Sequence, residues 1–150
     1  MNEDNFHLGI KALVKNSKGE YLLLKTNKAR INKEYYDIPG GRIKKGEDII
    51  ETLKREVFEE TGIDEITNIK ELGMTLANIR IPLKTGGDVG LILMVFEASI
   101  NDNSKITLSD EHVEYGFFDV IKAKELLKVK YPSEFLNKIF KSYSHIDLTS

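Results

Sequence analysis

The feature that most constrains the fold is one amphipathic helix in the middle of the chain, with strand-like stretches on both sides of it. From Asp48 to Thr61, apolar residues recur every three or four positions, as at Leu53 and Val57, and Gly62 follows where a helix C′ residue would lie. Such a helix has one apolar side, which must be covered by another layer of structure.

The stretches around this helix have the alternation or apolar content of strands. The first two, residues 7–15 and 21–24, are separated by the turn cluster 16–19 and predict a β-hairpin. The run Pro39-Gly40-Gly41 is expected to stop the third, because proline and glycine interrupt a regular ladder. The predicted strands are 7–15, 21–24, 35–38, 66–81 with Gly73 as a bulge, 89–100 and 113–118.

Two further helices are predicted near the C-terminal end. One spans about Ile121 to Lys128, and the last has Ser133 as its candidate N-cap and an apolar stripe that reaches Tyr143. This order of elements, with strands, a central helix, more strands and then helices, predicts an α/β (α+β) fold. In such a fold a mixed β-sheet lies between helices.

Length and composition exclude several classes of protein. The 150 residues, with a net charge of -2, suit a single domain over 1–150 and argue against a protein that coats nucleic acid. Without cysteine there is no disulfide framework and no thiol nucleophile. The acidic N-terminus does not resemble a secretory signal, and the longest apolar run, Val89 to Phe96, is too short to span a membrane. We therefore expect a cytoplasmic protein.

Three carboxylates occupy one side of the central helix. Glu56, Glu59 and Glu60 stand at positions i, i+3 and i+4, so they can converge on one point. Taken alone, such a pattern is more often a solvated acidic face than a metal site. If it binds an ion, ligands that are all oxygen favour Mg²⁺ or Mn²⁺. Arg55 precedes Glu59 by four residues and can pair with it.

The segment in front of the helix completes a longer motif. Gly41, five residues, Glu47, seven residues and then Arg55-Glu56-Val57-Phe58-Glu59-Glu60-Thr61-Gly62-Ile63 match the Nudix box at every defined position. The chain therefore resembles a Nudix hydrolase, and the resemblance implies that family's mixed sheet sandwiched between helices.

The resemblance also implies an activity: cleavage of a diphosphate linkage in a nucleoside triphosphate or a nucleoside diphosphate derivative, with Mg²⁺ or Mn²⁺ as cofactor. Glu47 would buttress the loop and helix, and Arg55 would orient a glutamate. The residues assigned to metal binding are Gly40, Gly41, Glu56, Glu59 and Glu60, and those assigned to catalysis are Arg55, Glu56, Glu59 and Glu111.

The group that takes the proton from water varies within the family. Here the segment 110–114 offers Glu111, His112 and Glu114, of which Glu111 is the first choice. His7 and His145 have no partner pattern and are expected to be structural or exposed.

Substrate identity is less constrained. Arg42 and Arg80 are the candidates for substrate contact, whereas the aromatic residues at strand positions are more often part of a core. In the family, a proline some fifteen residues after the box marks one substrate subgroup, and a tyrosine slightly later marks another. Neither residue stands at the corresponding position in this chain. We expect a small nucleotide-type substrate and a monomer or homodimer. The alternatives are a nucleotide-binding domain without turnover and an enzyme that trims RNA 5′ ends.

Overall fold

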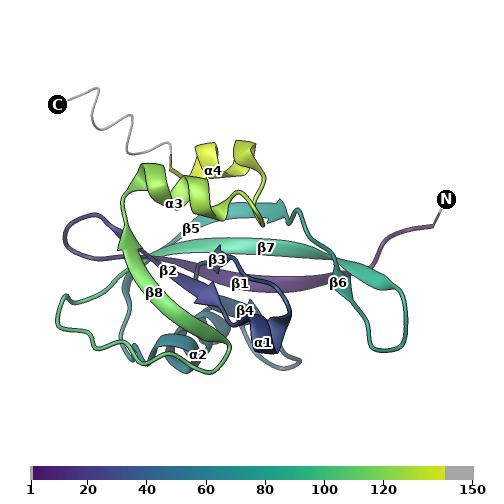
Figure 1. The fold of residues 1–150 in the computed structure, drawn as a ribbon, viewed down its shortest axis with the longest axis horizontal. Helices are drawn as coiled ribbons and strands as arrows, with labels where there is room; N and C mark the ends of the chain where they lie inside the picture. Colours follow the sequence, from purple (N-terminus) through teal and green to yellow (C-terminus); the bar gives the residue numbers. More distant parts are fainter. Residues whose placement is uncertain (1, 141–150) are drawn as a thin grey trace.

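The computed structural model describes residues 2–140 and contains one sheet system with helices on both of its faces (Figure 1). The elements are β1 (Phe6–Lys15), β2 (Tyr21–Thr26), α1 (Lys28–Ile31), β3 (Tyr36–Asp37), β4 (Gly40–Arg42), α2 (Ile49–Thr61), β5 (Thr67–Leu76), β6 (Ile81–Pro82), β7 (Asp88–Ser99), β8 (His112–Phe118), α3 (Val120–Leu127) and α4 (Ser133–Ile139).

The main sheet has the strand order β3-β2-β1-β7-β5. Strands β1 and β7 run parallel from the Phe6–Gly90 pair to the Lys15–Ser99 pair, and the other pairings are antiparallel. This confirms the predicted mixed sheet. No helix within residues 2–140 is long and apolar enough to cross a membrane.

The centre of the sheet is forked. Strand β1 pairs with β2 at Lys15–Tyr21, but toward its N-terminus, at 9–11, it pairs with β4 instead. Strand β2 continues with β3 on one side and β8 on the other. One branch is β1 with β4, and the other is β2 with β3 and β8. The two branches diverge, and the candidate site lies in the space between them.

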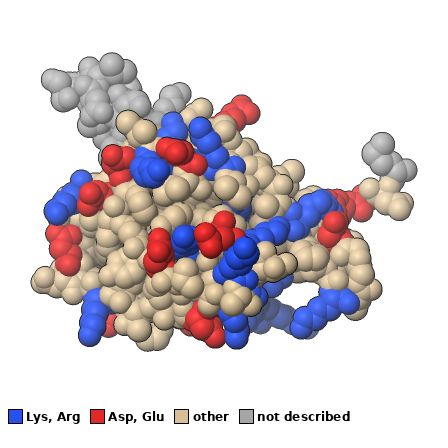
Figure 2. Space-filling model, viewed as in Figure 1, with Lys and Arg blue, Asp and Glu red and all other residues tan. Residues whose placement is uncertain are grey.

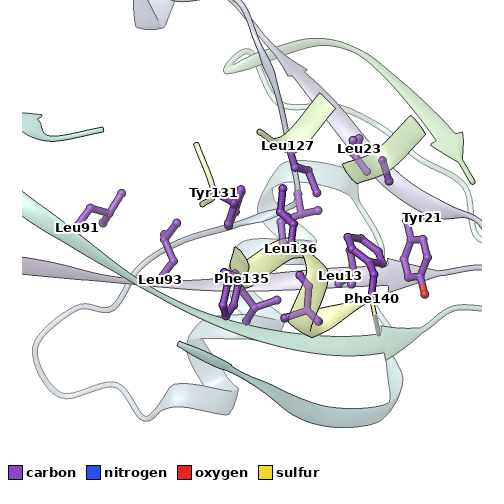
Figure 3. Close-up of a cluster of buried hydrophobic side chains, with 14 residues drawn as sticks. Leu13, Tyr21, Leu23, Leu91, Leu93, Leu127, Tyr131, Phe135, Leu136 and Phe140 are labelled. Carbon is purple, nitrogen blue, oxygen red and sulfur yellow. The ribbon is translucent and has the colours of Figure 1, made fainter. Parts of the chain in front are cut away.

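The two faces of the sheet have separate hydrophobic cores, because successive strand residues point to opposite sides. Ile10 and Ala12 of β1 pack in the core beneath α2, together with Leu53 and Val57. Leu13 lies in the other core, which α3 and α4 cover (Figure 3). In that core Tyr21 and Phe140 meet edge to face, with ring centroids 5.2 Å apart.

Local signals placed α2 correctly. The Asp48 side chain accepts a hydrogen bond from the Glu51 N–H at 2.7 Å, and Gly62 ends the helix with φ 76°. The predicted bulge at Gly73 is confirmed, since the β5–β7 register shifts between Glu71 and Gly73.

Four local expectations need correction. The segment 66–81 forms two strands, β5 and β6, rather than one, because the chain bends at residues 78–79. Gly40–Arg42 does form a strand, because β1 supplies a new partner for the Pro-Gly-Gly segment. The short helix α1 was not predicted; its caps are Asn27 and Asn32, and it has no apolar period. Pro132, rather than Ser133, is the N-cap of α4. Tyr143 and His145 lie outside the described residues.

Candidate metal and phosphate site

Helix α2 presents two glutamates to a pocket in the fork of the sheet. Burial of Leu53 and Val57 fixes the rotation of the helix, and Glu56 and Glu60 then line the pocket. Glu60 is only 6% exposed. The spacing of four residues puts both carboxylates on one helix side, as the sequence predicted.

The Gly40–Gly41 segment approaches these carboxylates closely. The Gly40 N–H donates a hydrogen bond to Glu60 Oε1 at 2.9 Å. A Cβ added at Gly41 would lie 2.3 Å from the carboxyl carbon of Glu56, and one at Gly40 would lie 2.2 Å from the Ile10 carbonyl oxygen. Only glycine lets this backbone lie against the acidic side chains.

Arg55 joins three acidic residues. Its Nε and Nη2 bind Glu47 Oε2 and Oε1 at 2.6 and 2.9 Å, which is a bidentate pair. Its Nη1 contacts Glu56 Oε1 at 2.8 Å and Glu59 Oε2 at 3.1 Å. The hydrogen bond with Arg55 and that with the Lys44 N–H hold the pKa of Glu47 at about 2. The arginine therefore ties the loop before α2 to the pocket carboxylates.

The segment before β8 brings a third carboxylate to the pocket. The backbone carbonyl of Glu111 accepts from the Asn27 N–H at 2.8 Å, and the Ser109 N–H contacts the Glu60 carbonyl at 3.3 Å. Ligand atoms of Glu60, Glu111 and His112 all lie within 4.8 Å of one another. We call Glu56, Glu60 and Glu111 the carboxylate cluster.

Two pKa values in this region are displaced. Burial raises the pKa of Glu60 to about 7, although Lys11 and the Gly40 N–H oppose part of the rise. Burial, assisted by Lys11, lowers the pKa of His112 to about 4. Among residues 2–140, the buried Nδ1 of His112 has no hydrogen-bond partner. A neutral imidazole and carboxylates that repel one another fit a divalent cation.

The pocket has a volume of about 540 Å³ and draws on both branches of the sheet. Basic and acidic side chains lie next to one another across the middle of the face seen in Figure 2. Besides the carboxylate cluster, the residues that line the pocket include Gly9, Lys11, Tyr35, Asp37, Gly40, Gly41, Arg42, Lys44, Leu91, Leu93, His112 and Lys130.

A second charged group in the pocket escaped sequence reasoning. Asp37 contacts Lys11 Nζ at 3.1 Å, Lys130 Nζ at 2.6 Å and the Tyr131 hydroxyl at 2.7 Å. We call these four residues the lysine cluster. Burial would raise the pKa of Asp37, but the two ammonium groups outweigh burial and lower it. The sequence contains one indication of this cluster: Lys11 stands two residues before Leu13, so both side chains point to the same, buried side of the sheet.

The predicted site residues are only partly brought together. Gly40, Gly41 and Arg42 line the pocket with the carboxylate cluster, and the Arg42 guanidinium lies 2.8 Å from His7 Nδ1. Glu59 does not line the pocket, and its side chain is 53% exposed.

Arg80 lies apart from the residues that line the pocket. It makes a bidentate pair with Asp4, at 2.9 and 3.0 Å, and contacts Asp88 at 2.8 Å. Arg80 therefore joins the start of β7 to the segment before β1.

The chain matches a protein-family model and solved structures. A family model described as NUDIX domain matches residues 5–139. The MutT protein from Methanosarcina mazei Go1 is 27% identical, with a TM-score of 0.75 over 95% of this chain and 99% of that chain.

Two more distant structures share the fold. A C. elegans Ap4A hydrolase is 18% identical, with a TM-score of 0.68 over 93% of this chain and 98% of that one. The E. coli dihydroneopterin triphosphate pyrophosphohydrolase is 17% identical, with a TM-score of 0.68 over 91% and 96%. No curated protein matches the sequence.

Proposed function

The chain belongs to the Nudix family of hydrolases, which act on phosphoric anhydrides, and we propose that it cleaves a diphosphate linkage in a nucleoside triphosphate or a nucleoside diphosphate derivative. The observation that carries this proposal is the convergence of Glu56, Glu60 and Glu111 on one pocket, against a backbone that only glycine allows. Nudix enzymes generally use divalent ions, and these oxygen ligands favour Mg²⁺ or Mn²⁺.

We infer that Glu56 and Glu60 hold the metal, with a carbonyl of Gly40 or Gly41 as a further ligand. Glu59 stays in the proposed set because Arg55 joins its carboxylate to that of Glu56. A divalent ion in this place neutralises diphosphate charge and makes water easier to deprotonate.

The remaining roles fall to groups around the carboxylates. We assign to Glu111 the role of taking the proton from water, because it is exposed and has a ligand atom within 4.8 Å of one of Glu60. Arg55 positions Glu56, and Glu47 fixes Arg55. Arg42 lines the pocket and supplies a cation for a substrate phosphate.

A substrate panel with Mg²⁺ and Mn²⁺ tests this proposal by comparing the wild type with Glu60→Gln. We expect release of phosphate or of a nucleoside monophosphate to fall by about 100-fold or more, since a lost metal ligand costs more than a lost supporting residue. Bound Mn²⁺, counted by electron paramagnetic resonance, should fall in parallel.

Glu51→Gln is the matched control, because Glu51 is exposed on the same helix and does not line the pocket. It should hydrolyse the substrate as fast as the wild type does. Nucleotide binding without turnover of any substrate by the wild type would instead favour a regulatory domain.

A further inference from the structure

The lysine cluster by itself places two ammonium groups and one carboxylate in the pocket. Lys11 and Lys130 both contact the same oxygen, Oδ2 of Asp37. Their side chains are only 7% and 10% exposed. Two buried ammonium groups thus share one carboxylate as their contact partner, and Glu60 interacts electrostatically with both of them. None of the proposed steps at the carboxylate cluster uses either lysine. Isolated buried charge is costly, so such an arrangement favours an arriving anion.

Asp37 has no acceptor capacity left for a ligand. Its Oδ1 accepts from the Tyr131 hydroxyl at 2.7 Å and from the Ile38 N–H at 2.8 Å, while Oδ2 faces the two lysines. Each carboxylate oxygen has about two acceptor sites. All four are therefore in use, and the carboxylate anchors the lysines rather than a substrate.

The lysine cluster therefore offers hydrogen-bond donors, and no acceptor, to a ligand in the pocket. Each ammonium carries three donors and no acceptor. Within residues 2–140, Asp37 is the one hydrogen-bond or ion-pair partner of either Nζ. Donors remain on both lysines, so an amino group of a ligand would find no acceptor there, whereas an oxyanion would find several donors.

Resting on the hydrolase function proposed above, we propose that Lys11 and Lys130 bind an oxyanion of the substrate, a phosphate or a carboxylate on the group that lies beside the scissile diphosphate. The two clusters border the same pocket. A substrate whose diphosphate lies at the carboxylate cluster therefore extends its second anionic group to the lysine cluster. Charge-assisted hydrogen bonds make this contact stronger than a neutral one.

The first test measures binding of inorganic pyrophosphate by calorimetry in EDTA, where no metal can hold the probe. Lys130→Met leaves one lysine against Asp37 and removes the extra charge, so the dissociation constant should rise by about tenfold or more. Lys11→Met makes the same change in charge, and it replaces Lys130→Met if that variant does not fold.

Two further variants separate charge from structure. Lys15→Met is the matched control, because Lys15 lies on the same strand, is paired with Glu97 at 3.3 Å and does not line the pocket. It should bind pyrophosphate like the wild type. The double variant Lys11→Met/Asp37→Asn keeps one net positive charge and should retain binding. Unchanged affinity in Lys130→Met, or an equal loss in Lys15→Met, overturns the proposal.

Turnover of matched substrates then identifies the anion. If it is a terminal phosphate, Lys130→Met lowers the preference for UTP over UDP. If it is a carboxylate, the variant lowers the preference for UDP-glucuronate over UDP-glucose. Loss of discrimination between bases, with both of these ratios unchanged, contradicts the proposal. Absence of turnover with every substrate would contradict the hydrolase function but leave the pyrophosphate result standing, since binding needs no turnover.

Discussion

The carboxylate cluster and the lysine cluster share one pocket but are built in opposite ways. The acidic residues come mostly from one turn of α2, with Glu56 and Glu60 four residues apart. The lysine cluster joins β1, β3 and the segment after α3, and its Lys130–Asp37 contact spans 93 residues. One cluster gathers negative charge and fits a cation, and the other has surplus positive charge and fits an anion. A short pattern can specify Glu56 and Glu60 of the first, but only the folded chain adds Glu111 and assembles the second.

The comparison predicts different responses to loss of a single charge. Asp37→Asn leaves both lysines of the lysine cluster without a counter-charge, so the free energy of unfolding should fall by about 3–5 kcal/mol. Chemical denaturation at pH 7 measures this loss. Glu111→Gln, which removes an exposed carboxylate from the other cluster, is the control and should leave stability nearly unchanged. Equal effects of the two substitutions would contradict the distinction.

The clusters should also differ in the sign of their pH dependence. Burial raises the pKa of Glu60 from 4.5 to about 7, so metal-free protein loses about 3 kcal/mol of stability as the pH rises through that interval. The pKa of Asp37 is lowered instead, so its contribution is present above pH 3.8 and is lost as the pH falls toward the folded-state pKa.

Thermal unfolding in EDTA from pH 3 to pH 8 separates these effects. Glu60→Gln should remove the decline in stability between pH 4.5 and 7 and keep the decline at acid pH. Mg²⁺ should offset the decline in the wild type, because it binds the ionised carboxylate. A Glu60→Gln variant with the wild-type profile would show that Glu60 titrates normally.

We expect the smallest of the three effects, a change in metal affinity, from substitutions in the Glu47–Arg55 pair. Glu47→Gln and Arg55→Met should each lower metal affinity by about 10- to 100-fold, because both loosen the carboxylates without removing a ligand. The double variant should be no worse than the more affected single variant, since the two residues act through one bidentate contact. Mn²⁺ titration measures this, and additive losses would mean that the residues act separately.

Much of the fold could be predicted because its signals are local. The period of α2, its Asp48 cap and its Gly62 end all act within one or two helical turns. The bulge at Gly73 has a similar origin, since the backbone there takes φ 141°. Helix α1 was missed because two asparagine caps, rather than an apolar stripe, define it.

The fork of the sheet could not be predicted in the same way. The sequence shows that 7–15 and 21–24 alternate, but it does not show that β1 leaves β2 and pairs with Gly40–Arg42. Strand pairing depends on which partners the folded chain brings together. The pocket exists because of that choice of partner.

The sequence by itself determined the α2 part of the carboxylate cluster: the spacing from Gly41 to Ile63 specifies one helix face, its glycine approach and its arginine brace within one continuous segment. Only the fold brings Glu111 to Glu60. Only the tertiary structure decided that Lys11 and Lys130 share Asp37 in the same pocket. Alternation along a strand tells which side a residue faces, but the partner of a buried charge depends on segments that meet only when the chain has folded.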